Sequence, residues 1–133
     1  ITRMLLNLAR QTPDLTITLM QGFAEISYSK IKRGLRISIT GYGASAIAER
    51  SYAQQYSEGK VKRIKYSKTI ISHRADSAAG SSGSAIISRS SNKIIGIHTR
   101  SGCGDLYRAN RGTLIYRNTN LIEAIKACTD GDL

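Results

Sequence analysis

Glycines and serine hydroxyls gather in one short stretch of this sequence, between Ala79 and Ala85, in the order Gly80-Ser81-Ser82-Gly83-Ser84. Residues this small let backbone come close to another group, and glycine adopts backbone angles that other residues avoid. A serine is a weak nucleophile by itself. It needs a base, a group that orients the base, and donors aimed at the developing oxyanion. The stretch is therefore a candidate nucleophile loop, if the rest of the chain supplies the other parts.

The chain is strongly basic, with 20 Lys and Arg against 9 Asp and Glu and a formal net charge of +11. Two clusters carry much of this charge: Lys30, Lys32, Arg33 and Arg36, and then Lys60, Lys62, Arg63, Lys65 and Lys68. Each cluster is either a solvated strand face or a surface that attracts an acidic partner, which means nucleic acid, anionic lipid or an acidic peptide. Apart from Tyr28 and Tyr66, neither cluster carries aromatic rings on which bases would stack.

The two cysteines, Cys103 and Cys128, permit one disulfide but do not require it. They show none of the close pairing that a zinc site needs, and we expect no metal site and no cofactor. Apolar runs are short, and none approaches the roughly 18 residues of a membrane-spanning helix. With 133 residues, the chain is long enough for one domain with a substantial core.

The candidate nucleophile loop lies between short β-branched segments that are separated by turn residues. Such segments are typical of a small antiparallel barrel, whose strands would hold the loop in place. The alternation of apolar and polar residues predicts strands over 14–20 and 35–40, one bent strand or two over 60–72, a hairpin of 85–88 with 93–97, and a strand over 112–116. Residues 1–11 have a short helical pattern, and residues 44–58 are expected to form a loop. Near the end, Asn120 and Glu123 fit a capping box, which predicts a helix over 119–128.

The run Gly80-Ser81-Ser82-Gly83-Ser84 resembles the signature of chymotrypsin-fold, trypsin-like serine endopeptidases. Ile94-Ile95-Gly96-Ile97-His98 is similar to a strand of glutamyl endopeptidases of the staphylococcal type and of chymotrypsin-like main proteases of positive-strand RNA viruses. The resemblance implies an all-β fold, a six-stranded antiparallel Greek-key barrel with a C-terminal α-helix, which is the second barrel of a double barrel. It also implies that Ser82 is the nucleophile and that the backbone N–H groups of Gly80 and Ser82 form the oxyanion hole.

The resemblance gives Asp14 the role of the triad aspartate, because Asp14-Leu15-Thr16-Ile17 is similar to the strand that carries it. Without the resemblance, Asp14 is a common turn residue after Pro13. The family has its catalytic histidine before the aspartate, whereas both histidines of this chain, His73 and His98, follow Asp14. We therefore interpret 14–133 as the C-terminal barrel of a protease, and 1–13 as the end of an interrupted N-terminal barrel or a linker. The catalytic histidine is expected from a separate N-terminal chain or a missing segment.

By the same resemblance, His98 lies where the family reads the substrate side chain, and its imidazole can donate to a Glu carboxylate or a Gln amide oxygen. Ser77 is implied as a second donor from the opposite wall, and Thr99 is a third candidate. The backbone from Thr99 to Ser101 is expected to pair with an extended substrate, while Arg100 either adds positive potential or faces solvent. Alternatively, His98 is a buried histidine bonded to a tyrosine or to the backbone.

The leading hypothesis is a serine endopeptidase that hydrolyses peptide bonds of a peptide or protein by Ser-His-Asp acyl transfer, after Glu or Gln. The first alternative is a catalytically inactive homologue that acts as a binding module. The second is a basic nucleic-acid-binding domain, whose RNA binding would depend on salt and survive Ser82→Ala. The localisation stays open, with a secreted or a virus-encoded protein expected.

Overall fold

The computed structural model describes residues 24–44, 48, 51, 53–65, 69–102 and 109–130. These residues fall into two units that we describe separately, a barrel within 25–118 and a helix at the C-terminal end. The helix expected over 1–11, the strand expected over 14–20 and the candidate aspartate Asp14 lie outside the described residues.

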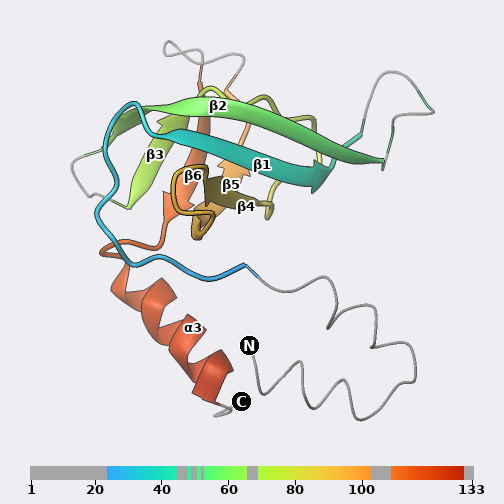
Figure 1. Cartoon of the computed structure of the whole chain (residues 1–133). Coiled ribbons are helices and arrows are strands. Elements are labelled where there is room, and N and C mark those ends of the chain that lie inside the picture. Colours follow the sequence, from blue (N-terminus) through green and yellow to red (C-terminus); the bar gives the residue numbers. More distant parts are fainter. Residues whose placement is uncertain are drawn as a thin grey trace, which may run out of the picture. The chain divides into compact units, whose positions relative to one another are not determined.

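Six strands form a closed antiparallel barrel in the order β1-β2-β3-β6-β5-β4 (Figure 1). Their bounds are β1 Arg36–Tyr42, β2 Gln54–Ile64, β3 Ile70–His73, β4 Ala85–Ser88, β5 Ile94–Arg100 and β6 Asn110–Leu114. The first three strands are consecutive neighbours, whereas β4 returns to pair with β1 and β6 pairs with β3. This Greek-key order confirms the expected all-β barrel.

Branched aliphatic side chains fill the interior of the barrel. In β1, Ile37 and Ile39 point inward while Arg36 and Tyr42 are exposed, which is the alternation that the sequence shows. The core cluster joins residues from all six strands and from the adjoining segments: Ile31, Ile37, Ile39, Val61, Ile71, Ala75, Ile86, Ile95 and Leu114. Each fully buried Ile or Leu contributes roughly 1.5–3 kcal/mol relative to an exposed one, so the core holds the strands in register.

One part of the expected strand pattern is wrong. Residues 54–58, expected to lie in a loop, form the first half of β2 and pair with β1, for example Tyr56 with Thr40. Their side chains are polar or aromatic because this half of β2 alternates between exposed and half-buried positions. A strand without an apolar face carries no period-two hydrophobic signal, although its backbone pairs like any other.

The segment between β3 and β4, residues 74–84, contains the candidate nucleophile loop. The two strands are not neighbours in the barrel, so this segment must pass from one part of the barrel wall to another. It is fastened on the way, because the Ala44 N–H donates to the Ala79 carbonyl at 2.7 Å. The loop is therefore held by the barrel on both sides.

The C-terminal unit contains the helix α3, Thr119–Asp130, which confirms the expected terminal helix. In the part of the chain that the structure describes, no helix has the length and apolar character needed to cross a membrane.

Candidate active site

Ser82 lies at the exposed tip of the loop between β3 and β4. Gly80 and Gly83 flank it with φ angles of +90° and +94°, which L-residues with a side chain rarely adopt. The two glycines thus allow the chain to reverse its direction tightly and leave the Ser82 hydroxyl exposed. Ser82 Oγ donates a hydrogen bond to the Thr99 carbonyl oxygen at 3.2 Å, which brings the candidate nucleophile to the end of β5.

Backbone hydrogen bonds fix the loop against β5. The Gly83 N–H donates to the His98 carbonyl at 2.8 Å, and the His98 N–H donates to the Ser84 carbonyl at 2.8 Å. On the other side of the nucleophile, the side chain of Ser81 is buried and its N–H donates to the Ala78 carbonyl at 3.1 Å. The loop is therefore an ordered extension of the sheet rather than a free connection.

The N–H groups of Gly80 and Ser82 are the expected oxyanion donors. Their neighbours Ser81, Gly83 and Ser84 all donate to backbone carbonyls, whereas no such bond involves Gly80 N–H or Ser82 N–H within the described residues. Two N–H groups without an internal acceptor beside a serine hydroxyl are what an oxyanion hole requires.

His98, the candidate specificity residue, is buried against the second histidine of the chain. His73 Nε2 and His98 Nδ1 lie 3.2 Å apart, and both residues are at most 1% exposed. Burial first, and then the charge of His98, lower the pKa of His73 from 6.5 to about 4. Burial also lowers the pKa of His98. Both imidazoles are therefore neutral at pH 7, with one ring donating to the other.

A cleft of about 580 Å³ opens next to this pair. Its lining residues are His73, Arg74, Asp76, Ser77, Gly102, Ala109 and Asn110. Two buried polar atoms of this wall, His73 Nδ1 and Ser77 Oγ, have no hydrogen-bond partner in the described structure. Buried polar atoms are rarely left unpaired, so these two atoms suit a bound polar group.

Asn110 holds two walls of the cleft together. Its Oδ1 accepts from the Gly102 N–H at 2.9 Å, and its Nδ2 donates to the Ala75 carbonyl at 2.7 Å. The cleft also carries one charge of each sign, because the exposed residues Arg74 and Asp76 both line it.

The structure brings some of the expected site residues together and separates others. Ser82 meets Thr99 directly, and Ser77 lines the cleft with His73. His98 does not line the cleft itself and lies behind it, bonded to His73. The Thr99 hydroxyl donates to the Arg111 carbonyl at 3.4 Å. Arg100 and Ser101 are exposed at the end of β5, and Asp14 lies outside the described residues.

Two residues of the site, His73 and Asn110, were not assigned to it from the sequence. The signal for His73 was present: it lies two residues after Ile71 in β3 and therefore shares its inward face. Asn110 has no comparable signal, because its partners are 8 and 35 residues away in the sequence. Among the described residues, no three His, Cys, Asp or Glu side chains gather in a way that could hold a metal ion.

Comparison with known proteins gives matches to solved structures, whereas no protein-family model and no curated protein matches the chain. A Glu endopeptidase in complex with MPD matches with a TM-score of 0.68 at 23% identity, over 86% of this chain and 52% of that one. Catalytically active tobacco etch virus protease with bound product matches at 0.51 and 19% identity, over 75% and 41%. An inactivated protease paralogue of the scabies mite matches at 0.56 and 11% identity, over 76% and 49%.

The barrel therefore has the fold of the chymotrypsin-like serine proteases, as the sequence resemblance implies. The chain spans about half the length of the Glu endopeptidase that it matches.

Proposed function

We propose that this chain is the C-terminal barrel of a serine endopeptidase, with Ser82 as the nucleophile. The observation that carries the proposal is the Ser82 loop: an exposed hydroxyl between two positive-φ glycines, beside two N–H groups that have no backbone acceptor in the described structure. In this proposal, Ser82 Oγ attacks the peptide carbonyl, and the N–H groups of Gly80 and Ser82 stabilise the oxyanion of the tetrahedral intermediate.

The general base of this reaction comes from a segment outside the given sequence. His73 and His98 are both buried and hydrogen-bonded to each other, and Ser82 Oγ donates to a backbone carbonyl instead. A histidine from an N-terminal barrel would replace Thr99 as the acceptor of the serine proton. Asp14 would then orient that histidine and stabilise its imidazolium.

We further propose that the cleft accepts the side chain of Glu, or of Gln, before the scissile bond. Ser77 Oγ and the His73–His98 pair offer donors at the cleft wall, and the two buried atoms without a partner would be paired by a carboxylate or an amide. The exposed backbone of Thr99 to Ser101 would add the substrate as an extended strand, with Arg100 beside it. The charges of Arg74 and Asp76 in the cleft lining cancel each other. The hydrogen-bond donors of the cleft wall, rather than its net charge, would therefore decide the preference for Glu or Gln.

The test is labelling with a fluorophosphonate, which reacts with activated serines. The chain is labelled alone and together with an N-terminal segment that carries a histidine, and Ser82→Ala is compared with Ser84→Ala. We expect labelling in the complete assembly, loss of label in Ser82→Ala and retention in Ser84→Ala. Peptides that differ only in Glu, Gln or Lys before the scissile bond then report the specificity. The proposal is contradicted if fluorophosphonate does not label Ser82 in the complete assembly.

The second candidate is a catalytically inactive homologue that binds peptides. The hydrogen bond from Ser82 to the Thr99 carbonyl favours it, since that contact leaves the hydroxyl without a base. The barrel also matches an inactivated protease paralogue of the scabies mite. Peptide binding by the complete assembly, without fluorophosphonate labelling, would support this candidate over the enzyme.

A further inference from the structure

Strands β1 and β2 form a ribbon on the barrel, and one of its faces points away from the core. The two long strands lie side by side (Figure 1), with Arg36 opposite Lys60, Thr40 opposite Tyr56 and Tyr42 opposite Gln54. Because side chains alternate along a strand and Ile37 and Ile39 are buried in the core, Arg36, Thr40 and Tyr42 lie on the opposite face of β1. We call these outward side chains of β1 and β2 the ribbon face.

Cations gather at one end of the ribbon face. Arg36 and Lys60 are direct cross-strand partners and both are exposed. Arg89 is adjacent, because its N–H donates to the Arg36 carbonyl at 3.0 Å. Like charges directly opposite each other destabilise a sheet, so this end of the ribbon carries a repulsion that an anion would relieve.

A turn brings further cations to the same end. Lys32 and Arg33 are exposed just before Gly34, whose N–H donates to the Val61 carbonyl at 2.9 Å, next to Lys60 in β2. Lys32, Arg33 and Arg36 of the first basic cluster therefore lie close to Lys60 of the second, although about thirty residues separate the two clusters along the chain.

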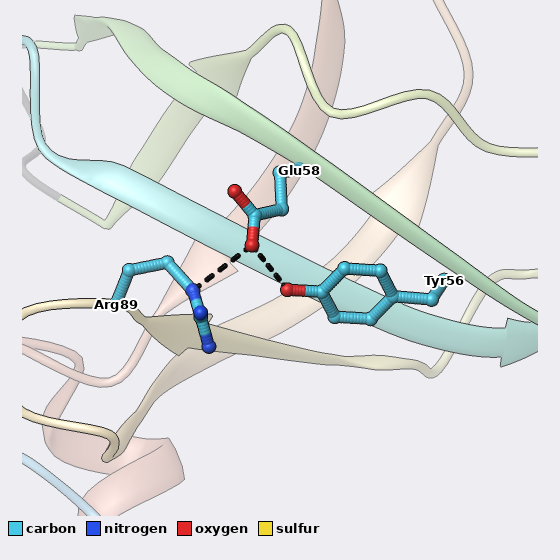
Figure 2. A network of polar contacts seen from close by, with 3 residues as sticks. All are labelled: Tyr56, Glu58 and Arg89. Carbon is cyan, nitrogen blue, oxygen red and sulfur yellow. Dashed lines mark hydrogen bonds and ion pairs between the residues drawn. The ribbon is translucent and has the colours of Figure 1, made fainter.

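Glu58, the acidic residue of the ribbon face, neutralises Arg89 at this end and leaves the charges of Arg36 and Lys60 without an ion pair within the described residues. Its carboxylate forms an ion pair with Arg89 Nε at 3.1 Å and accepts a hydrogen bond from the Tyr56 hydroxyl (Figure 2). The Tyr56 bond, followed by the charges of Arg89 and Arg36, lowers the pKa of Glu58, which stays ionised. Within the described residues, neither Arg36 nor Lys60 has an ion-pair partner.

Aromatic rings occupy the other end of the ribbon face. Tyr42 and Tyr56 are 59% and 57% exposed, and they are diagonal neighbours, because Tyr42 pairs with Gln54 and Tyr56 lies two residues beyond it. All exposed large hydrophobic side chains in the described residues are tyrosines. Tyrosine rings stack on bases, whereas a bilayer would be anchored by aliphatic side chains that this surface lacks. Nucleic acid therefore fits the face better than lipid.

We infer that the ribbon face binds single-stranded nucleic acid, with the phosphates at the Arg36–Lys60 end and a base stacked on Tyr42 or Tyr56. The two ends are six residues apart along β1, about 20 Å, so one short strand reaches both. Unpaired bases are required for stacking, which favours a single strand over a duplex. This binding uses no residue of the candidate active site, and it holds whether or not the chain is a peptidase.

The test is fluorescence anisotropy with a labelled oligouridine of about 12 nucleotides, at several salt concentrations. We expect Arg36→Gln with Lys60→Gln to weaken binding by about tenfold or more, and to lower the slope of log affinity against log salt by about 1.4, for two lost phosphate contacts. Tyr42→Ala with Tyr56→Ala should weaken binding by about tenfold or more at an unchanged salt slope. Far-UV circular dichroism verifies that each variant is folded.

Matched controls separate this surface from net charge alone. Arg100→Gln with Arg117→Gln removes the same charge from exposed barrel positions outside the two ribbon strands and should change the affinity by less than about twofold. The tyrosine variant should keep its affinity for inorganic polyphosphate, which has no bases, and Ser82→Ala should bind like the unchanged chain. The inference is overturned by an equal loss in the arginine control, by unchanged oligouridine binding in the tyrosine variant, or by tighter binding to phosphatidylserine vesicles.

Discussion

The Nε2 atom of His73 lies 3.2 Å from the Nδ1 atom of His98 inside the barrel, with the ring planes at 67° to each other. The two residues belong to β3 and β5, which are separated by β6 in the sheet order. One ring must donate and the other accept, so the contact does not survive when both rings carry two protons. The protonation of this pair therefore affects the stability of the barrel and the charge at the wall of the cleft, which His73 lines.

The barrel should lose stability as the pH falls from about 6.5 to about 4, through His73. Its pKa is about 4 in the folded chain and about 6.5 in the unfolded chain, so the unfolded chain binds the proton more strongly between these values. The shift of about 2.5 units corresponds to about 3 kcal/mol of unfolding free energy, present above pH 6.5 and lost below pH 4. Urea denaturation at several pH values measures it, and His73→Phe should remove that part of the pH dependence. An equal pH dependence in His73→Phe would contradict the assignment.

Under the proposed function, the preference of the complete assembly for Glu over Gln should increase at acidic pH. At pH 7 both histidines are neutral because burial lowers the pKa of each, and neutral donors serve an amide as well as a carboxylate. A bound carboxylate favours a protonated imidazole, so the ratio of kcat/KM for Glu to that for Gln should rise as the pH falls from about 8 to about 5.5. His73→Gln, which removes the imidazole that lines the cleft, should show a flat ratio. A ratio that is equally steep in this variant would assign the effect to another group.

Much of the barrel could be predicted from the sequence because its signals are local. The alternation in β1 and the hairpin of β4 and β5 follow from neighbouring residues. The terminal helix was also predicted, but its capping box was wrong, because α3 begins at Thr119 and Asn120 therefore lies inside the helix. The first half of β2 was missed because it has no apolar face and is defined by its pairing with β1.

The same distinction between local and distant signals applies to the candidate site. The Ser82 loop is visible as a local motif, whereas the contact of His73 with His98 joins residues 25 apart. The ribbon face likewise arises from register, since only strand pairing brings Tyr42 close to Tyr56 and Arg36 opposite Lys60. Long-range pairing of this kind leaves no period in a single sequence, so it had to come from the structure.

Asn110 should stabilise the cleft through its two backbone hydrogen bonds. Replacing it with Ala leaves the Gly102 N–H and the Ala75 carbonyl without their partner. Because a part-buried group that loses its hydrogen bond costs about 1–3 kcal/mol, we expect Asn110→Ala to lower the unfolding free energy by about 2 kcal/mol. Ser101→Ala, at an exposed position beside the same wall, is the control and should be nearly neutral. Equal stabilities for the two variants would show that Asn110 does not hold the walls together.

Ala substitutions at Gly80 and Gly34 distinguish the effect of backbone strain from the effect of losing an oxyanion-hole N–H. Both have positive φ angles, +90° and +85°, and an added methyl group would meet no atom closer than 3.7 Å at either position. Ala at either position therefore costs about 1–2 kcal/mol of backbone strain, and the two variants should unfold at similar urea concentrations. Only Gly80→Ala displaces the N–H that we assign to the oxyanion hole, so in the complete assembly it should label with fluorophosphonate far more slowly than Gly34→Ala. If both variants label at the same rate, the Gly80 N–H does not stabilise the oxyanion and the hole must be sought elsewhere in the loop.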